Sequence, residues 1–572
     1  MKKFILTALV GAGFAASAAT YTNAGNITVD TTWTAGDIYI LTNQVFVTAG
    51  ASLTIEAGVT VKGLSDSDTG LKSLNGGGGS LAVCRGAKIY ANGTAEAPIT
   101  FTSSNDNGTR RDACNEWGNI TIMGKGLISA SSDQSRTRAG NTKKPDGTNE
   151  VQMEGLTGSN TLTYYGGNDD SDDSGTLAYV NLRYGGNVIG QANELNGLSL
   201  GGIGSETDIH HIEIYNNVDD GIEIWGGKVN LKYFSIWNIG DDSLDVDQGW
   251  RGTAQFGLIV QGASQAGKQG SGVGDNCIEI DGAEDSDAQP LTSCRIANVT
   301  VVGNKLGGDG GATYRDNARI QYSNMIFMNL GEELIRLDNQ DGDGGSGYGN
   351  GMTEWAATWT TSADTYEALN FTNNIYGSLA DLYTAQYAAG NLNEMINSVF
   401  YNNSVDSDDK ASEVGVLSEP SNVSATASPI VAAEFTLGSF HSGAITAPVY
   451  TNINPLAQND AVTLSGAVSD ANIVRADYAG GFSATHNWLI PWATTAQYGI
   501  TTGTTNGVPA ASAATGVVIS FDSVDGTTYA IQSRSSNTDA WVEVATVKGT
   551  GATLTYGDES LTDAEFYQVV IK

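Results

Sequence analysis

The most constraining feature of the chain is an interval of 22 residues that repeats between residues 193 and 281. Residues 219–224 read DDGIEI, and 22 positions later residues 241–246 read DDSLDV. After a further 34 positions, which is one interval plus an insertion of 12, residues 275–280 read DNCIEI, and residues 332–337 return as EELIRL. Short apolar segments that alternate with polar residues and are broken by Gly, Asn and Asp at this period indicate stacked coils.

Such coils predict a parallel β-helix, because each is too small to bury its own apolar residues and must cover them against the coils before and after it. Successive side chains of a strand point to opposite faces. Ile222 and Ile224 should therefore face the core, and Glu223 should face outward. Insertions can loop out of single coils without disturbing the stack.

The rest of the chain suggests further segments around this β-helix. Lys2 and Lys3, an apolar run from Phe4 to Phe14 and the small residues before position 19 predict a secretory signal peptide. The alternating apolar residues of the last segment predict a small all-β sandwich. The expected organisation is a signal peptide (1–18), a parallel β-helix (19–500) with a long insertion (124–175) and irregular C-terminal coils (352–500), a linker (501–515) and a small β-sandwich (516–572).

Composition narrows the classes of partner. The net charge is −35, from 63 acidic and 28 basic residues, which argues against binding to nucleic acid or to an anionic membrane surface. No stretch after the signal peptide is long and apolar enough to span a membrane. Cations and glycans are therefore the more natural partners, and the signal peptide predicts a secreted or cell-surface location.

Four cysteines allow two disulfides in an exported protein. Their order in the sequence favours two local pairs, Cys84 with Cys114 and Cys277 with Cys294. Cys277 also occupies an ordinary position of the coil repeat, so a free thiol is the alternative there.

Short motifs of one kind are spread along the chain: TWT (32–34), LTIEAG (53–58), ANGT (91–94), PITFT (98–102), WGNI (117–120), NGLSLGG (196–202), AGGF (479–482) and WLIPW (488–492). As a set, these motifs resemble a family of exported bacterial β-helix proteins of undefined activity. The resemblance implies a right-handed parallel β-helix at the cell surface or outside the cell and no settled reaction. The tail FYQVV at 566–570 is similar to small C-terminal modules that serve in sorting or attachment.

The segment GDDSL at 240–244 also resembles the double-aspartate motif of polygalacturonase-type glycosidases, which share the β-helix. That likeness makes Asp219, Asp220, Asp241 and Asp242 candidates for acid and base catalysis. The His-Gly motif of those enzymes has no counterpart, which puts hydrolysis in doubt.

Stacking predicts columns of acids about 4.8 Å apart, the spacing of neighbouring strands. Two carboxylates at this distance repel by about 3 kcal/mol at an effective dielectric constant near 20, so a bound cation, a raised pKa or a hydrogen-bond donor must offset the repulsion. Calcium suits such oxygen-rich sites outside the cell. The predicted ligands are Asp219, Asp241 and Asp275 in one column, Glu223, Asp245 and Glu279 in another, and Asp338, Asp341 and Asp343 in an acidic loop.

An alternative explains the aspartate pairs without a metal. Asp219, Asp220, Asp241 and Asp242 precede strands, where their side chains can accept hydrogen bonds from backbone N–H groups of the turn. This alternative is weaker for Glu223, Asp245 and Glu279, which lie within strands.

Two functions compete on these grounds. The first is a binding or structural role towards polysaccharide or surface polymers. Aromatic side chains offer apolar faces to sugar rings, and the candidates are Tyr215, Trp225, Trp237 and Trp250. The alternative is that these side chains are packing residues. The second is a polysaccharide-active enzyme, either a glycosidase or a calcium-dependent lyase with Lys228, Lys232 or Arg251 as base. We expect an exported binding or structural protein stabilised by Ca²⁺, with the enzyme as the alternative.

Overall fold

A computed structural model describes a large part of the chain. The predicted signal peptide, Asp341, Asp343 and residues 505–515 of the predicted linker lie outside the described residues. The chain divides into two compact units, Met1–Thr505 and Asn506–Lys572. The described residues are 19–23, 25–64, 78–109, 113–130, 149–186, 195–263, 274–283, 290–338, 348, 353–363, 390–440, 445–458, 462, 472–504, 518–522, 528–534, 542–548, 553–557 and 566–571.

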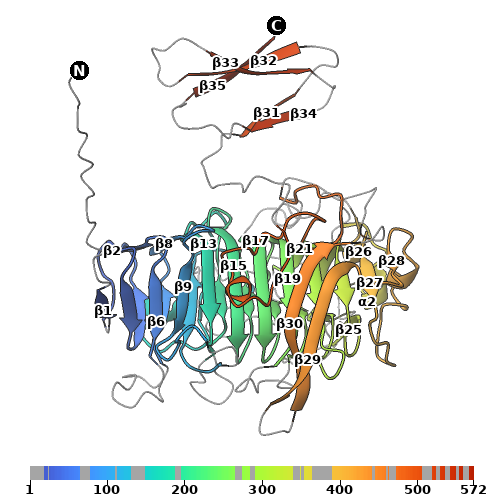
Figure 1. Cartoon of the computed structure of the whole chain (residues 1–572), viewed down its shortest axis with the longest axis horizontal. Helices are drawn as coiled ribbons and strands as arrows, with labels where there is room; N and C mark the ends of the chain where they lie inside the picture. Colours follow the sequence, from blue (N-terminus) through green and yellow to red (C-terminus); the bar gives the residue numbers. More distant parts are fainter. Residues whose placement is uncertain are drawn as a thin grey trace, which may run out of the picture. The chain divides into compact units, whose positions relative to one another are not determined.

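The first unit is a right-handed parallel β-helix, which confirms the predicted fold class. Successive coils add strands to two long parallel sheets (Figure 1). Sheet A contains β1 (Thr20–Asn23), β2 (Thr31–Trp33), β3 (Ile38–Leu41), β5 (Ser52–Ile55), β6 (Thr60–Gly63), β8 (Lys88–Asn92), β9 (Ile99–Ser103), β13 (Gly175–Arg183), β15 (Asp208–Asn217), β17 (Asn230–Ile239), β19 (Thr253–Val260), β21 (Ser293–Val302), β23 (Arg319–Ser323), β24 (Ile326–Met328), β26 (Glu394–Ile396), β27 (Val399–Tyr401) and β28 (Val423–Ser424). Sheet B contains β4 (Gln44–Val47), β7 (Ser80–Val83), β10 (Asn119–Met123), β14 (Leu198–Gly201), β16 (Ile222–Trp225), β18 (Leu244–Asp247), β20 (Ile278–Asp281), β22 (Ala312–Arg315) and β25 (Ile335–Leu337).

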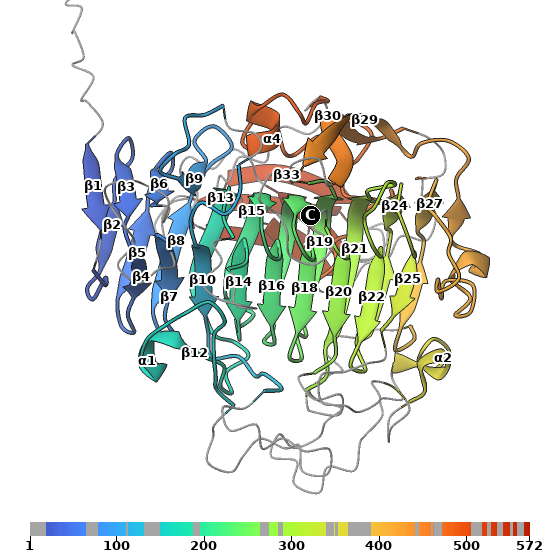
Figure 2. The same cartoon turned by 90° about the horizontal axis from the view of Figure 1, so that it is seen from below.

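The register of sheet B follows the sequence interval. Glu223 pairs with Asp245, 22 residues later, and Asp245 pairs with Glu279 across the coil that carries the insertion. Figure 2 shows the strands of sheet B as one row of parallel arrows from β4 to β25. Insertions therefore leave the coils in register, as expected for a solenoid.

Apolar side chains fill the inside of the coils. Ile222 and Ile224 are fully buried and stack on Leu244 and Val246 of the next coil. Turns are closed by asparagine ladders, in which Asn238 Nδ2 donates to Asn216 Oδ1 at 2.9 Å. Both asparagines have positive φ (54° and 60°), a backbone region that Asn enters at lower cost than most residues.

The described parts of the predicted insertion 124–175 cover one half of sheet B from outside. They include β11 (Val151–Gln152), which pairs antiparallel with β12 (Tyr164–Tyr165), and α1 (Asn160–Thr163). Tyr165 and Met153 pack with Trp225 and with the outward side chains Phe46 and Ala82. This apolar cover ends at β16, and the coils that follow present acids on the same face.

The last part of the first unit covers sheet A. In the described residues, the predicted irregular coils contain the parallel strands β26 to β28, which extend sheet A, the antiparallel hairpin of β29 (Ile430–Phe440) and β30 (Ile445–Ala457), and short helices. Asn181 of β13 donates to the Trp492 carbonyl and accepts from the Thr494 N–H, each at 3.0 Å. The buried Glu213 carboxylate accepts from the N–H and the hydroxyl of Thr495. The helices are α2 (Trp355–Thr358), the 3-10 helix η2 (Val416–Ser418) and α4 (Thr494–Gln497).

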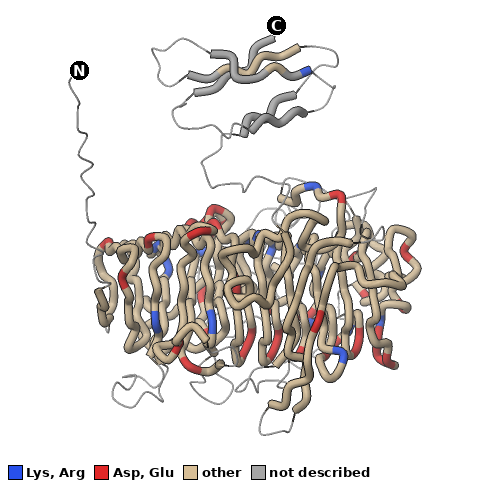
Figure 3. The backbone as a smooth tube through the Cα atoms, viewed as in Figure 1, with Lys and Arg blue, Asp and Glu red and all other residues tan. Residues whose placement is uncertain are grey.

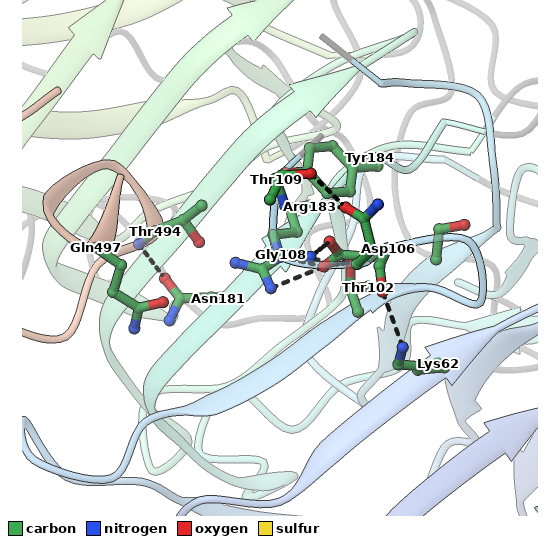
Figure 4. A network of polar contacts seen from close by, with 12 residues as sticks. Lys62, Thr102, Asp106, Gly108, Thr109, Asn181, Arg183, Tyr184, Thr494 and Gln497 are labelled. Carbon is green, nitrogen blue, oxygen red and sulfur yellow. Dashed lines mark hydrogen bonds and ion pairs between the residues drawn. The ribbon is translucent and has the colours of Figure 1, made fainter. Parts of the chain in front are cut away.

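A polar network close to this covering segment ties three coils of sheet A together (Figure 4). Asp106 Oδ2 accepts from Arg183 Nε at 2.9 Å, and the Asp106 carbonyl accepts from Lys62 Nζ at 3.0 Å. Burial alone would raise the pKa of Asp106, but the Arg183 guanidinium and the Gly108 N–H hold it below its ordinary value. One ion pair and one bond from a lysine to a backbone carbonyl therefore join these three coils.

The described residues of the second unit form five antiparallel strands. β31 (Val518–Asp522) pairs with β34 (Thr553–Gly557), and β32 (Thr528–Arg534) pairs with both β33 (Val542–Lys548) and β35 (Phe566–Ile571).

The predicted disulfides are wrong for this structure. Cys84, Cys277 and Cys294 are described as buried free thiols, so neither Cys84–Cys114 nor Cys277–Cys294 is bridged. The reason is the coil geometry. Cys277 precedes β20 of sheet B and Cys294 lies within β21 of sheet A, where each is an ordinary core residue. Proximity along the chain does not bring them together.

Among the described residues, no helix has both the length and the apolar character needed to cross a membrane.

The coil stack predicts a steep cost for shortening a core side chain. Ile236 is fully buried and pairs with Ile214 and Ile259 of the neighbouring coils. Ile236→Ala should lower the free energy of unfolding by about 3 kcal/mol and Ile236→Val by about 1 kcal/mol, because cavities in a packed core relax only in part. Urea unfolding followed by circular dichroism measures both. The exposed control Glu206→Ala should change the free energy of unfolding by less than about 0.5 kcal/mol. Equal losses for the three variants would contradict the stacking.

Candidate metal centre

The outward face of sheet B carries a column of acids beyond the apolar cover. Glu223, Asp245 and Glu279 are direct cross-strand partners in β16, β18 and β20. Two residues further along the strands, Asp247 and Asp281 lie on the same face. Acidic positions recur along one edge of the coil stack in Figure 3. Thr313 and Arg336 continue the Glu223 column in later coils, so the predicted position of Arg336 is confirmed.

A second column lies at the turns before these strands. The Asp275 N–H donates to the Asp241 carbonyl at 2.9 Å, and the Asp309 N–H donates to the Asp275 carbonyl at 3.3 Å. The column therefore extends past the predicted Asp219, Asp241 and Asp275 to Asp309. Sequence reasoning missed Asp309 because its coil reads DGGATY, without the second acid or the strand acid. Its distance of 34 residues from Asp275, equal to that between Asp241 and Asp275, was the available signal.

The second aspartate of each pair has a turn role. Asp220 Oδ1 accepts from the Asp242 N–H at 3.0 Å, and Asp242 Oδ1 accepts from the Asn276 N–H at 2.6 Å. These bonds join consecutive coils, as the alternative without a metal expects. They engage one oxygen of each carboxylate.

The coils differ in whether the turn supplies a donor to the strand acid. Asn276 Nδ2 donates to Glu279 Oε2 at 2.7 Å, and Asn196 Nδ2 donates to Glu223 Oε2. In the two coils between them, Asp220 and Asp242 occupy the same turn position. An ionised aspartate has no proton to donate. Asp220 and Asp242 therefore add acids beside Glu223, which receives the amide of the preceding coil, and beside Asp245, whose Oδ1 has no partner among the described residues.

The result is two overlapping acidic clusters. One carboxylate oxygen from each of Asp219, Asp220 and Asp241 lies within 4.8 Å of the others, and the same holds for Asp220, Glu223 and Asp245. Asp245 Oδ1 is buried and has no hydrogen-bond partner. Each close pair of charges costs about 3 kcal/mol at an effective dielectric constant near 20. Among the described residues, the charge of Arg315 lowers the pKa of Asp245, but burial and the charge of Glu279 outweigh it.

The pKa values reflect this imbalance. Burial, followed by the charge of Glu279, raises the pKa of Asp245 to about 8. Burial and the neighbouring carboxylates also raise the pKa values of Asp220, Glu223 and Asp242 well above their ordinary values. Some of these carboxylates therefore hold protons at neutral pH. A cation that displaces the protons is attracted by the fully ionised carboxylates.

The donor set fits calcium. It consists of carboxylate oxygens that can each bind through one or two atoms, and calcium takes six to eight oxygen ligands in flexible geometries. Of the predicted ligands, the structure gathers Asp219, Asp241, Glu223 and Asp245, and it adds Asp220. The other predicted ligands that the structure describes, Asp275, Glu279 and Asp338, have different partners, and Asp341 and Asp343 lie outside the described residues. Glu279 Oε1 accepts from Arg315 at 2.5 Å, Asp338 lies 3.9 Å from Arg315, and burial together with a hydrogen bond to Asp309 raises the pKa of Asp275 to about 8.

Other candidates from the sequence lie away from this centre. Arg251 is fully buried and pairs with Asp170, and Lys228 lies 3.9 Å from the same carboxylate. Lys232 lines a cavity of about 490 Å³ with His210 and Tyr233. The basic residue that the structure places beside the acids is Arg315, which sequence reasoning missed because its coil lacks the acidic pattern.

The aromatic side chains proposed as a ligand surface are packing residues. Tyr215, Trp225, Trp237 and Trp250 are all buried. Trp225 contacts Tyr165 with ring centroids 6.0 Å apart, and Tyr215 pairs with Trp237 across sheet A. The packing alternative is therefore the correct one for these four residues.

Comparison with known proteins found one family. A family model described as a pectate-lyase like beta helix domain matches residues 25–397. No curated protein and no solved structure matches the chain.

The raised pKa of Asp245 predicts a pH dependence of stability without calcium. Between its ordinary value of 3.8 and its folded value of about 8, the folded protein keeps a proton that the unfolded chain has lost. Raising the pH through this window should therefore destabilise the fold by about 1.4 kcal/mol per pH unit for each such proton. Melting temperatures in a chelating buffer should fall as pH rises, and Asp245→Asn should flatten the slope. A slope equal to that of the exposed control Asp208→Asn would contradict the assignment.

The asparagine pattern predicts a gain of stability in the absence of metal. Asp220→Asn with Asp242→Asn gives both coils the amide donor found at Asn196 and Asn276 and removes two charges. In chelator, the free energy of unfolding should rise by about 3 kcal/mol, the scale of one relieved close repulsion. Calcium should then stabilise the variant much less than the parent, as measured by calorimetry.

The control for this experiment is Asp208→Asn with Asp477→Asn, which removes two exposed carboxylates. It should retain the calcium response of the parent. A response of equal size in both double variants would rule out the cluster as the calcium site.

Proposed function

The chain belongs to the pectate-lyase-like β-helix family, and from that premise we propose that it binds an anionic, uronate-containing polysaccharide through calcium held on sheet B. The observation that carries the proposal is the cluster of Asp220, Glu223 and Asp245, in which a buried carboxylate oxygen has no partner. A cation held there with open coordination positions would attract the carboxylates of a polyuronate chain, which the acids alone would repel. The predicted export fits a polymer found outside cells.

Arg315 supports the choice of an anionic polymer. Its guanidinium lies at the end of the acidic face, 2.5 Å from Glu279 Oε1 and 3.4 Å from Asp281 Oδ2. The side chain keeps 29% of its surface exposed, more than either acid. Arginine binds planar carboxylates through paired hydrogen bonds. It therefore gives a uronate a direct contact beside the calcium.

The charge state of Arg315 favours binding over lyase chemistry. Burial would lower its pKa, but Asp281 and Glu279 outweigh that effect and raise it above the ordinary value. A general base must lose its proton near the working pH. Because Arg315 is held in its protonated form, its position supports recognition of the polymer and not abstraction of a proton.

One observation favours a glycosidase as the second candidate. Asp245 has a pKa of about 8, so it holds a proton at neutral pH as a general acid requires. Glu223 and Glu279 on either side could serve as the second carboxylate. Release of reducing ends from a polymer that the protein binds would support this candidate.

The binding proposal predicts a calcium-dependent affinity for polygalacturonate. Titration calorimetry with the purified protein should show binding in CaCl₂, none in chelator, and none to a neutral dextran. Arg315→Gln should weaken binding about tenfold, the loss of one charge-assisted contact of about 1.5 kcal/mol, and leave calcium binding intact. The exposed control Arg475→Gln should bind as the parent does. Binding that is equal with and without calcium would refute the proposal.

A further inference from the structure

A third group of acids lies further along the turn column, next to the last strand of sheet B. One carboxylate oxygen from each of Asp309, Glu332 and Glu333 lies within 4.8 Å of the others. Glu333 is 95% buried, since its exposure is 5%, and its Oε2 has no hydrogen-bond partner. Asp309 Oδ1 is also buried and without a partner. Two buried carboxylate oxygens are thus unsatisfied at one point.

The charges around this group do not balance. Arg336 Nη1 lies 2.9 Å from Asp309 Oδ2 and neutralises one carboxylate. The negative charge of Asp406, from a later part of the chain, contributes to the raised pKa values of Glu332 and Glu333. The hydrogen bond to Asp309, followed by burial, raises the pKa of Glu332 to about 7. The cluster therefore holds more acid than its one arginine can offset.

The group lies where the chain closes the end of sheet B. Among the described strands, β25 is the last of that sheet, and its outer edge has no partner among them. The segment 404–410 covers this edge, because Asp409 accepts from the N–H groups of Leu334 and Ile335 at 3.3 and 3.4 Å. The Lys410 N–H in turn donates to the Ile335 carbonyl at 2.9 Å. Covering an edge prevents unwanted pairing with other chains.

The covering segment is itself acidic. It contains Asp406, Asp408 and Asp409, and it approaches a turn that carries Glu332 and Glu333. Like charges would push the two segments apart. A cation between them would hold the cover in place.

We propose that Asp309, Glu332 and Glu333 form a calcium site that fastens the segment 404–410 over the open edge of sheet B. Three carboxylates offer up to six oxygens, which meets the lower limit of calcium coordination, and Asp406 or water can complete it. Magnesium demands a strict octahedron at shorter distances and suits such a set less well. The site stabilises the fold, and it does not depend on the proposed binding of polysaccharide.

Carboxyl labelling of the parent protein tests the proposal without a variant. Glu332 is exposed and should react with a water-soluble carbodiimide and an amine, and CaCl₂ should lower its labelling several-fold as read by mass spectrometry. Glu206, which is also exposed, is the internal reference and should not change. Labelling of Glu332 that is the same with and without calcium would overturn the proposal.

A double variant separates this site from the centre on sheet B. Glu332→Gln with Glu333→Gln should bind one calcium fewer per chain in titration calorimetry and should lose part of the drop in melting temperature that chelator causes. The control Glu96→Gln with Glu413→Gln removes two exposed carboxylates and should match the parent. The Glu332 and Glu333 variant should still bind polygalacturonate. In the Asp220→Asn with Asp242→Asn variant, calcium should still lower the carbodiimide labelling of Glu332. Unchanged stoichiometry in the Glu332 and Glu333 variant would contradict the site. If that variant does not fold, the labelling of the parent decides.

Discussion

The structure depends on one geometric constraint, the stacking of equivalent residues of successive coils at about 4.8 Å. Apolar residues benefit from it, because Ile222 and Leu244 cover each other inside the coil. Amides benefit as well, because an asparagine can donate to the asparagine above it, as Asn238 does to Asn216. Acids do not, since stacking brings equal charges together in a partly buried place. The placement of acids is therefore the informative feature of this β-helix.

Sheet B resolves the repulsion in different ways along its length. At Asn196 and Asn276 a turn amide donates to the strand acid, and at Arg315 a guanidinium lies between two acids. At Asp220 and Asp242 backbone N–H groups satisfy one oxygen of each turn acid. Among the described acids of sheet B and its turns, buried carboxylate oxygens without a hydrogen-bond partner remain on Asp245, Asp281, Asp309 and Glu333. The two proposed calcium sites follow from these residual imbalances and not from acidity in general.

Different segments of the chain cover the two sheets of the coil stack, and the two sheets therefore differ in which side chains remain available to a ligand. The segment that contains Trp492 and Thr494 lies over sheet A, where Glu213 and Asn181 are committed to internal hydrogen bonds. The insertion around Tyr165 covers the first half of sheet B with apolar contacts. The acidic face between β16 and β22 follows where that cover ends. Recognition of a charged polymer is therefore proposed for this face, whereas the large aromatic residues serve packing.

The sequence by itself determined the fold of the first unit and the columns of acids, because an interval of 22 residues fixes which side chains become neighbours whatever the loops do. Glu223, Asp245 and Glu279 could be aligned from numbering alone, even across an insertion. Only the tertiary structure decided which acids lack a partner and which basic residue joins them. Arg315 and Asp309 lie in a coil whose pattern is broken, and the amide of Asn276 acts through side-chain geometry that no spacing encodes. The predicted cysteine pairs failed because proximity along the chain says nothing about which sheet of the coil a side chain occupies. The tryptophans are packing residues, the alternative that the sequence had left open, and only the tertiary structure shows what covers them.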